Sequence, residues 1–220
     1  MRWSNRSLLR TAALLASASL LGACNVVGAG DAGQIYQMAE GMFSGGKKVT
    51  LEEAAAVPYA SMGLSVGGST QTMLILASDE YGQRMWTSSA RITVTTQNGR
   101  IMRTAGLGHN LHAYNLRMEP QKDGGRFDVH LEADLPSLGL YMIKIDCEDR
   151  PAGEETITIL GKDIHTRRIE ERCVANRSQI DWSFRNTYWV APASGLVWRS
   201  IQHVSPRIEA LELETLRPPN

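Results

Sequence analysis

Two short patterns in the sequence are of the kind that carry catalysis, and neither stands in the context that its chemistry needs. Gly63-Leu64-Ser65-Val66-Gly67 matches the G-x-S-x-G nucleophile elbow of hydrolases, but that elbow needs a strand turning sharply into a helix, and here a second strand pattern follows at residues 72–77. Residues 41–48 approach a phosphate-binding loop, but Lys48 replaces the Ser or Thr whose hydroxyl binds magnesium. We expect Ser65 to lie on a strand that ends in a glycine-rich turn, with no catalytic role for either pattern.

The histidines give a weak signal for a metal site. His109 and His112 lie three residues apart, which is a spacing that lets two imidazoles reach one metal. No cysteine or carboxylate cluster accompanies them, and the segment lacks a helical pattern. We therefore expect surface or turn histidines, with no metal site and no cofactor.

A mixed charge cluster lies in a later strand pattern, where Arg167, Arg168 and Arg172 alternate with Glu170 and Glu171. Charges of both signs at such close spacing are typical of a solvated face on which the side chains pair with one another. We expect this cluster to be exposed.

Cys24 is the residue with the most specific chemistry. Three arginines and no acidic residue precede it, an apolar segment of signal-peptide length follows them, and the segment ends in Leu21-Gly22-Ala23-Cys24. A branched apolar residue, two small residues and a cysteine form a lipobox, in which the thiol receives a diacylglyceryl group and a signal peptidase cuts before the cysteine. The alternative is an ordinary secretory signal with a coincidental cysteine, but charge, apolar core and cysteine all fall in register.

Lipidation of Cys24 predicts a membrane anchor for the rest of the chain. Acyl chains contribute about 0.8 kcal/mol for each buried methylene, so several chains hold a protein on a membrane essentially permanently. Residue 25 is Asn rather than Asp, which under enterobacterial sorting rules predicts the outer membrane. We divide the chain into a signal peptide at residues 1–23, a glycine-rich tether at 24–33 and a single β domain at 34–220.

The charge balance changes when the chain is divided at Cys24. The full sequence has 23 basic and 23 acidic side chains; removing three arginines with residues 1–23 leaves 20 against 23, a net charge of −3 over 197 residues. This mild acidity gives no reason to expect nucleic acid as a partner. Export to an oxidising compartment leaves Cys147 and Cys173 as an even pair, either bonded to each other or as two buried free thiols. A bond would stabilise the fold by roughly 3–4 kcal/mol.

The periodicity of apolar residues changes near residue 59. Residues 35–43 have helical spacing after Asp31, and Thr50-Leu51-Glu52-Glu53 forms a capping box for a short second helix that Pro58 ends. From Tyr59 onward, alternating apolar and polar residues predict strands, including a hairpin about Asn98-Gly99. About ten strands without intervening helices predict a mainly β fold, either an antiparallel sandwich or a partly open barrel, with a short N-terminal helical segment.

Aromatic residues gather in the last third of the chain, at Trp182, Phe184, Tyr188, Trp189 and Trp198. Aromatic faces stack on sugar rings, so Trp182, Tyr188, Trp189 and Trp198 are candidates for a saccharide platform. At strand spacing such residues more often belong to the core. Both interpretations stay open at this point.

Several segments together resemble the YjbF/GfcB family of bacterial lipoproteins, which is associated with group-four capsule and other exopolysaccharide systems. They fall in similar order over residues 35 to 218, and no single one is diagnostic. The segments are Val57–Met62, Met85–Ser88, Asn98–Ile101, Thr104–Leu107, Ile169–Cys173, Asn186–Val190 and Gly195–Ser200, with Gln202 and Pro206. The sequence departs from the family at Gly63-Leu64-Ser65, where relatives often carry a basic residue, and at the loop of residues 121–125.

The resemblance implies an outer-membrane lipoprotein that faces the periplasm and supports production or export of an extracellular polysaccharide. Family members are encoded beside a capsule-type export channel, a small periplasmic capsule protein and a large outer-membrane barrel. The partners implied are therefore the outer membrane, through acyl chains on Cys24, and other proteins of a polysaccharide export system, with the polysaccharide itself as a third. The family has no established catalytic residues, so Cys24 is the one functional position that transfers.

We therefore expect a non-enzymatic accessory lipoprotein that recognises its partner through a sheet edge or a surface patch. The first alternative is a carbohydrate-binding module that uses the late aromatic residues. The second is a polysaccharide-modifying enzyme.

Overall fold

The computed structural model describes residues 46–122 and 126–219, and in this part of the chain nearly all regular structure is β-strand. One short helix, α2, precedes the strands, and a single 3₁₀ turn, η1, interrupts them. The elements are α2 (Leu51–Ala55), β1 (Ser61–Val66), β2 (Thr72–Glu80), β3 (Gln83–Thr87), β4 (Thr93–Gln97), β5 (Arg100–Ala105), β6 (His112–Pro120), β7 (Phe127–Leu135), η1 (Pro136–Leu138), β8 (Leu140–Ile159), β9 (Lys162–Ala175), β10 (Ser183–Val190), β11 (Val197–Gln202) and β12 (Leu211–Arg217).

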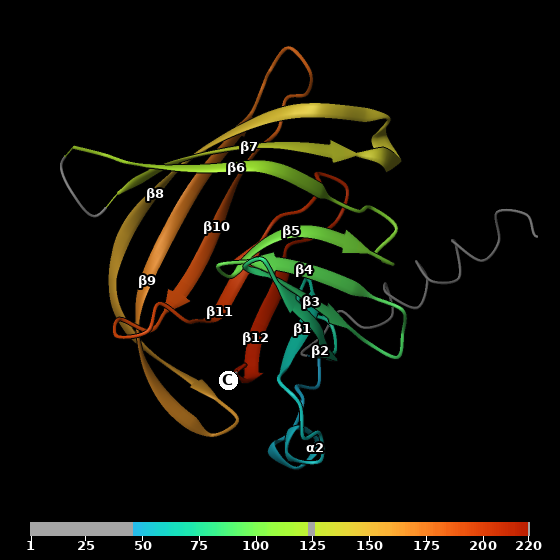
Figure 1. Cartoon of the computed structure of the whole chain (residues 1–220), viewed down its shortest axis with the longest axis vertical. Helices are drawn as coiled ribbons and strands as arrows, with labels where there is room; N and C mark the ends of the chain where they lie inside the picture. The colour runs from blue at the N-terminus through green and yellow to red at the C-terminus, as the bar shows by residue number, and fades with distance from the viewer. Residues whose placement is uncertain (1–45, 123–125, 220) are drawn as a thin grey trace, which may run out of the picture. The chain divides into compact units, whose positions relative to one another are not determined.

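The twelve strands close into one antiparallel barrel (Figure 1). Each strand pairs with its neighbours in sequence, and β1 closes the ring on β12, with Leu64 opposite Leu213. Closure leaves the first and last strands with a hydrogen-bonded partner on each side, as an edge strand would not have. The mainly β prediction is confirmed, but the sandwich or partly open barrel of about ten strands is corrected to a closed barrel of twelve.

The difference in strand number has local causes. β1 contains Gly63 of the G-x-S-x-G pattern and ends at Val66, just before Gly67, so its strand signal in the sequence is weak; its pairing to both β2 and β12 compensates. β6 begins at His112, for which the sequence predicts a surface or turn position and no strand. β8 is a single strand of 20 residues, whereas the apolar pattern of the sequence predicts two shorter strands, at residues 141–147 and 157–160, separated by polar residues near Pro151.

Inward-facing side chains at alternate positions fill the barrel. Leu74, Val94, Val129, Ile143 and Leu211 are fully buried, and each comes from a different strand. Because interiors are packed at crystal-like density, this layer fixes the strand register through the strict period of two.

A second apolar cluster lies on the outside of the barrel. At Pro151–Glu154 the β8–β9 pairing shifts register, and Gly153 has a φ of 100°, so the end of this hairpin bends away from the wall. Ile157 and Ile159 on the bent tip pack against Trp189 of β10. Figure 1 shows the tip of β8 and β9 curling toward the end of β12.

The backbone pairing around the barrel is sparsest between β5 and β6. These strands share one paired position, Arg103 with His112, whereas β8 and β9 pair over most of their length. At this seam the Leu111 amide donates to the Thr104 hydroxyl at 3.0 Å, and the Thr104 amide donates to the Leu111 carbonyl at 2.9 Å. The backbone hydrogen bonds that hold β5 in the sheet are therefore mainly those with β4.

The segment before β1 lies along the outer wall. The predicted capping box is confirmed: the Thr50 hydroxyl accepts from the Glu53 amide at 3.2 Å, and the Glu53 carboxylate accepts from the Thr50 amide at 2.8 Å. Lys48 then pairs with the buried Glu214 of β12 at 2.8 Å. The helical segment predicted at residues 35–43, and Cys24 with its signal and tether, lie outside the described residues. No described helix has the length and apolar character needed to cross a bilayer.

Candidate functional site at the mouth of the barrel

The most deeply buried charge pair of the barrel joins Arg100 to Glu171. Arg100 follows the two-residue turn Asn98-Gly99, whose φ values of 52° and 79° have the left-handed conformation expected of the predicted hairpin. Its guanidinium donates to both Glu171 carboxylate oxygens, at 2.5 and 2.7 Å. Glu171, on β9, is fully buried. The pair therefore ties the β4–β5 hairpin to the opposite wall.

Three further side chains complete the surroundings of Glu171. The amide of Asn186 donates to its Oε2 at 2.9 Å, and the hydroxyl of Tyr188 donates to the same oxygen at 3.2 Å. The Gln202 carbonyl accepts from the Ile101 backbone amide at 2.8 Å, and its amide donates to the Gly99 carbonyl at 2.8 Å. These bonds fix the hairpin to β10 and β11 as well as β9.

The electrostatics of the pair follow from burial and charge. Burial by itself raises the pKa of Glu171, but the Arg100 charge and the hydrogen bonds from Asn186 and Tyr188 outweigh it and hold that pKa below its ordinary value. Burial chiefly raises the pKa of Tyr188. Burial opposes the charge on Arg100, but Tyr188 and Glu171 raise its pKa overall. Both partners are therefore charged over the physiological range.

Asp149 lies beside this pair, and its pKa is shifted in the direction opposite to that of Glu171. It is opposite Glu171 in the β8–β9 ladder, and its Oδ1 accepts a hydrogen bond from the Phe127 amide. Burial is the main cause that raises its pKa, and the nearby Glu171 carboxylate adds to the effect, while the Phe127 bond and Arg100 oppose it. Two carboxyls with pKa values shifted apart form the arrangement of an acid–base pair. Because Arg100, Asn186 and Tyr188 occupy the Glu171 oxygens, that carboxylate is held as a structural counter-ion.

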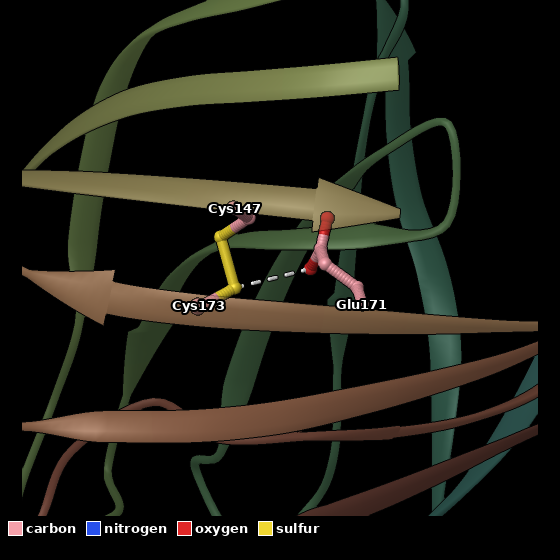
Figure 2. Close-up of side chains that lie close together, drawn as sticks. All are labelled: Cys147, Glu171 and Cys173. Carbon is pink, nitrogen blue, oxygen red and sulfur yellow. Dashed lines mark hydrogen bonds between the residues drawn. A yellow bond between two sulfur atoms is a disulfide. The ribbon is translucent and has the colours of Figure 1, made fainter. Parts of the chain in front are cut away.

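A disulfide joins Cys147 and Cys173 beside the ion pair (Figure 2). The two residues face each other on β8 and β9 with a Cα–Cα distance of 4.0 Å, and both are buried in the main core. Cys173 Sγ lies 3.5 Å from Glu171 Oε2. These three residues are the one group with metal-ligand geometry in the described part of the chain, and the S–S bond leaves neither sulfur as a thiolate ligand.

The β4–β5 turn spans the barrel opening and divides it. A Cβ placed on Gly99 would lie 2.3 Å from Val197 Cγ2, so the turn contacts the start of β11. Asn98 and Val197 border a cavity of about 430 Å³ on the side of β1, β3 and β12, and also a smaller one of about 120 Å³ on the side of β6, β8 and β9. The smaller cavity includes Arg100 and Asp149 in its wall.

Comparison with known proteins agrees with this architecture. The model of the family described as "Group 4 capsule polysaccharide lipoprotein gfcB, YjbF" matches residues 36–216. The chain belongs to this family. It is 27% identical to "Uncharacterized lipoprotein GfcB" of Escherichia coli K12 in an alignment of 183 residues that covers 76% of this chain and 80% of the relative.

One further match adds a shorter stretch of similarity to a relative, and another shows the fold. "Uncharacterized lipoprotein YjbF" of Escherichia coli K12 is 34% identical over 76 residues, 34% of this chain and 36% of the relative. A crystal structure of the hypothetical lipoprotein YmcC from the same organism matches with a TM-score of 0.64 at 23% identity, covering 78% of this chain and 90% of that one. The closed barrel is thus shared with a solved structure.

The late aromatic residues of this YjbF/GfcB-family chain, from Trp182 to Trp198, form no exposed platform. Trp182 packs in the main core, stacked on Phe184 at 4.2 Å between ring centroids, and Tyr188 belongs to the Glu171 site. Trp189 and the partly buried Trp198 lie under the tip of the β8–β9 hairpin. The four candidate saccharide contacts are therefore core and packing residues, because strand alternation and the folded-back hairpin cover both faces of β10.

The remaining candidates also lie away from the mouth. Ser65 is on the strand β1, as expected, opposite Glu212. His109 contacts the Ser137 hydroxyl at 3.0 Å, and His112 packs edge-on against Tyr114. Lys48 pairs with Glu214. The prediction that Ser65 lies on a strand is confirmed.

The prediction of a fully solvated charge cluster at residues 167–172 is wrong for Glu171. Glu170 lies on the outer side and pairs with Arg168 and Arg185, but Glu171 faces inward. The sequence did contain a signal for this. Residues two positions apart on a strand point to the same face, so a buried disulfide at Cys173 places Glu171 on the inner face as well. No sequence pattern indicated that Arg100 would reach it from 71 residues away.

Proposed function

We propose that this chain is a non-enzymatic lipoprotein that is anchored by acylated Cys24 to the periplasmic face of the outer membrane and supports production or export of a capsule-type or other extracellular polysaccharide. The observation that carries the proposal is the family match over residues 36–216, which includes nearly the whole barrel. The lipobox at Leu21–Cys24 supplies the anchor.

The chemistry of the described residues supports an accessory role. The buried carboxylate of Glu171 has its oxygens engaged by Arg100, Asn186 and Tyr188, so it is not free to act as a nucleophile or general base. Ring closure also shifts the expected recognition away from a sheet edge and toward the barrel surface and its mouth.

Deletion of the gene, followed by location of the polymer, tests the proposal. Polymer retained in the periplasm indicates export, and polymer absent from every fraction indicates synthesis or its regulation. Re-expression of the full chain should restore surface polymer. A deletion strain with the normal amount of surface polymer would overturn the proposal, and surface polymer of altered length or decoration would indicate an enzyme.

A further inference from the structure

We propose that the larger cavity at the barrel mouth is a glycan-binding site that takes one or two sugar rings of a neutral polysaccharide chain. The inference rests on the proposed function and names the ligand class of this mouth. It places recognition on hydroxyl and amide groups of β4, the β4–β5 turn and β11, away from the late tryptophans.

The cavity has an exposed rim and a buried floor. Asn98 and Ser194 on the rim are exposed, whereas Trp86, Thr96 and Ser200 below them are 2%, 5% and 1% exposed. Its volume of about 430 Å³ falls within the roughly 300–1,000 Å³ of small-molecule sites. A ligand would enter past the rim and reach preformed walls.

Side chains at both the rim and the floor of the cavity have hydrogen-bonding capacity that no described residue uses. The Ser200 hydroxyl accepts from the Gln202 amide at 2.8 Å, and the Thr96 hydroxyl accepts from Trp86 Nε1 at 3.0 Å. Neither hydroxyl proton has an acceptor among the described residues, and the Asn98 amide makes no side-chain bond to any of them. Each buried hydroxyl therefore keeps a proton that it can donate, and the exposed Asn98 amide keeps its full capacity, for a ligand or for water that a ligand displaces.

The charge of the lining selects among ligand classes. Residues of the wall include no carboxylate, and its one cation, Arg84, is already paired with Asp79 at 2.8 Å. A cationic ligand would therefore meet no carboxylate, and an anionic one would meet only this arginine, whose Nε is already engaged by Asp79. An acyl chain would leave the hydroxyl and amide groups unpaired, which costs free energy. A sugar ring presents hydroxyls to the polar side and C–H groups to the apolar side formed by Met62 and Leu213.

The floor is held in place before any ligand arrives. Gln202, which fixes Ser200, is also bonded to Gly99 and Ile101, so the same side chain positions the floor and the turn that forms the rim. Preorganised donors lose little entropy on binding.

The test measures binding by the lipidated full chain in phospholipid nanodiscs. The probe is a set of short oligosaccharides that partial acid hydrolysis releases from the polysaccharide secreted by the source strain, separated into neutral and acidic pools. Titration calorimetry gives the affinity. We expect the neutral pool to bind.

A matched pair of variants locates the site. Asn98→Gly removes the rim amide but suits the φ of 52°, and Asn115→Gly makes the same change at the same φ on the outer face of β6. Losing one or two hydrogen bonds should weaken binding about three- to tenfold in Asn98→Gly, with no change in Asn115→Gly. Ser194→Trp, which fills the opening from an exposed loop position, should weaken it by about tenfold or more.

Several outcomes would overturn the inference. They are no binding at millimolar oligosaccharide, binding of the acidic pool alone, equal effects of the two glycine variants, or full binding by a folded Ser194→Trp chain. The inference and the proposed function fail separately, because the deletion strain reports polymer location whether or not the mouth binds sugar. A deletion phenotype without sugar binding would leave the accessory function intact and remove only the glycan site.

Discussion

At the scale of single residues, the ion pair between Arg100 and Glu171 is the feature on which the barrel interior depends most. Burying two charges is costly, and the geometry here offsets that cost with two Arg100 bonds and the donors Asn186 and Tyr188. Removing one partner leaves the other charge buried without a counter-charge. Such a pair therefore fixes one arrangement of the hairpin rather than adding a large net stability.

Glu171→Gln tests this dependence. It should lower the free energy of unfolding by about 3–5 kcal/mol, because the buried Arg100 loses its counter-charge, and urea unfolding measures the change. Glu170→Gln, one residue away on the outer side, should cost about 1 kcal/mol or less, as exposed pairs do. Similar losses in the two variants would contradict the structural role of Glu171.

The same residue predicts part of the acid sensitivity. Because the folded-state pKa of Glu171 lies below 4.5, the stability that its ionised form contributes is present above pH 4.5 and is lost as pH falls through the folded-state pKa. The difference in unfolding free energy between the wild type and Glu171→Gln should shrink over that range. A difference that stays constant at acid pH would show that ionisation of Glu171 is not involved.

Asp149 should make a contribution to stability whose pH dependence is opposite to that of Glu171. Its folded-state pKa is raised by burial, so protonation stabilises the fold, and this contribution is complete below pH 3.8 and lost as pH rises through the folded-state pKa. Relative to Asp149→Asn, the wild type should gain stability as pH falls from neutral toward 4. Parallel stability curves for the two proteins would contradict the shift.

At the scale of elements, the disulfide and the β4–β5 hairpin join walls of the barrel. The Cys147–Cys173 bond links β8 to β9 across a sequence separation of 26, and in the chain-entropy model it contributes roughly 3–4 kcal/mol. Intact mass should show no alkylation of these cysteines in the native protein, and two labels after reduction and unfolding. Labelling of the native chain without reductant would refute the bond.

The close approach of the hairpin to β11 predicts a difference between two glycines. Gly99 and Gly82 both occupy turns, with φ values of 79° and 77°, but an added Cβ meets Val197 at 2.3 Å in the first and nothing within 4 Å in the second. Both alanine variants should lose about 1–2 kcal/mol from backbone strain. Gly99→Ala should lose roughly a further 1–3 kcal/mol from overpacking. Equal thermal stabilities would contradict the contact.

Much at this scale was predictable from sequence. The Asn98-Gly99 turn and the Thr50 capping box are local signals, and the structure has both. The closure of β1 on β12 was not predictable, because it depends on a pairing between residues about 150 positions apart. The folded-back tip of β8 and β9 was missed for a similar reason, since it covers Trp189 through contacts that no local period encodes.

At the scale of the whole molecule, the chain combines a lipobox with a closed barrel whose mouth is divided into two cavities. The family match and the lipobox support a membrane-anchored role in polysaccharide production or export. The larger of the two cavities is the surface at which we propose that the barrel recognises its ligand. Neither cavity was predictable from sequence, because each is lined from several strands and the turn that separates them. Position at the membrane is the requirement of the proposed function, and the rigid mouth is the requirement of the glycan site inferred from it.

The most direct measurement is the amount of surface polymer in a deletion strain that expresses only the Cys24→Ser chain, at levels matched to the wild type by immunoblot. Without the thiol there is no acyl anchor, so we predict that palmitate labelling is lost and that surface polymer stays at the level of the deletion strain, whereas the wild-type chain restores it. Full surface polymer from an equal amount of unlabelled Cys24→Ser protein would contradict the account.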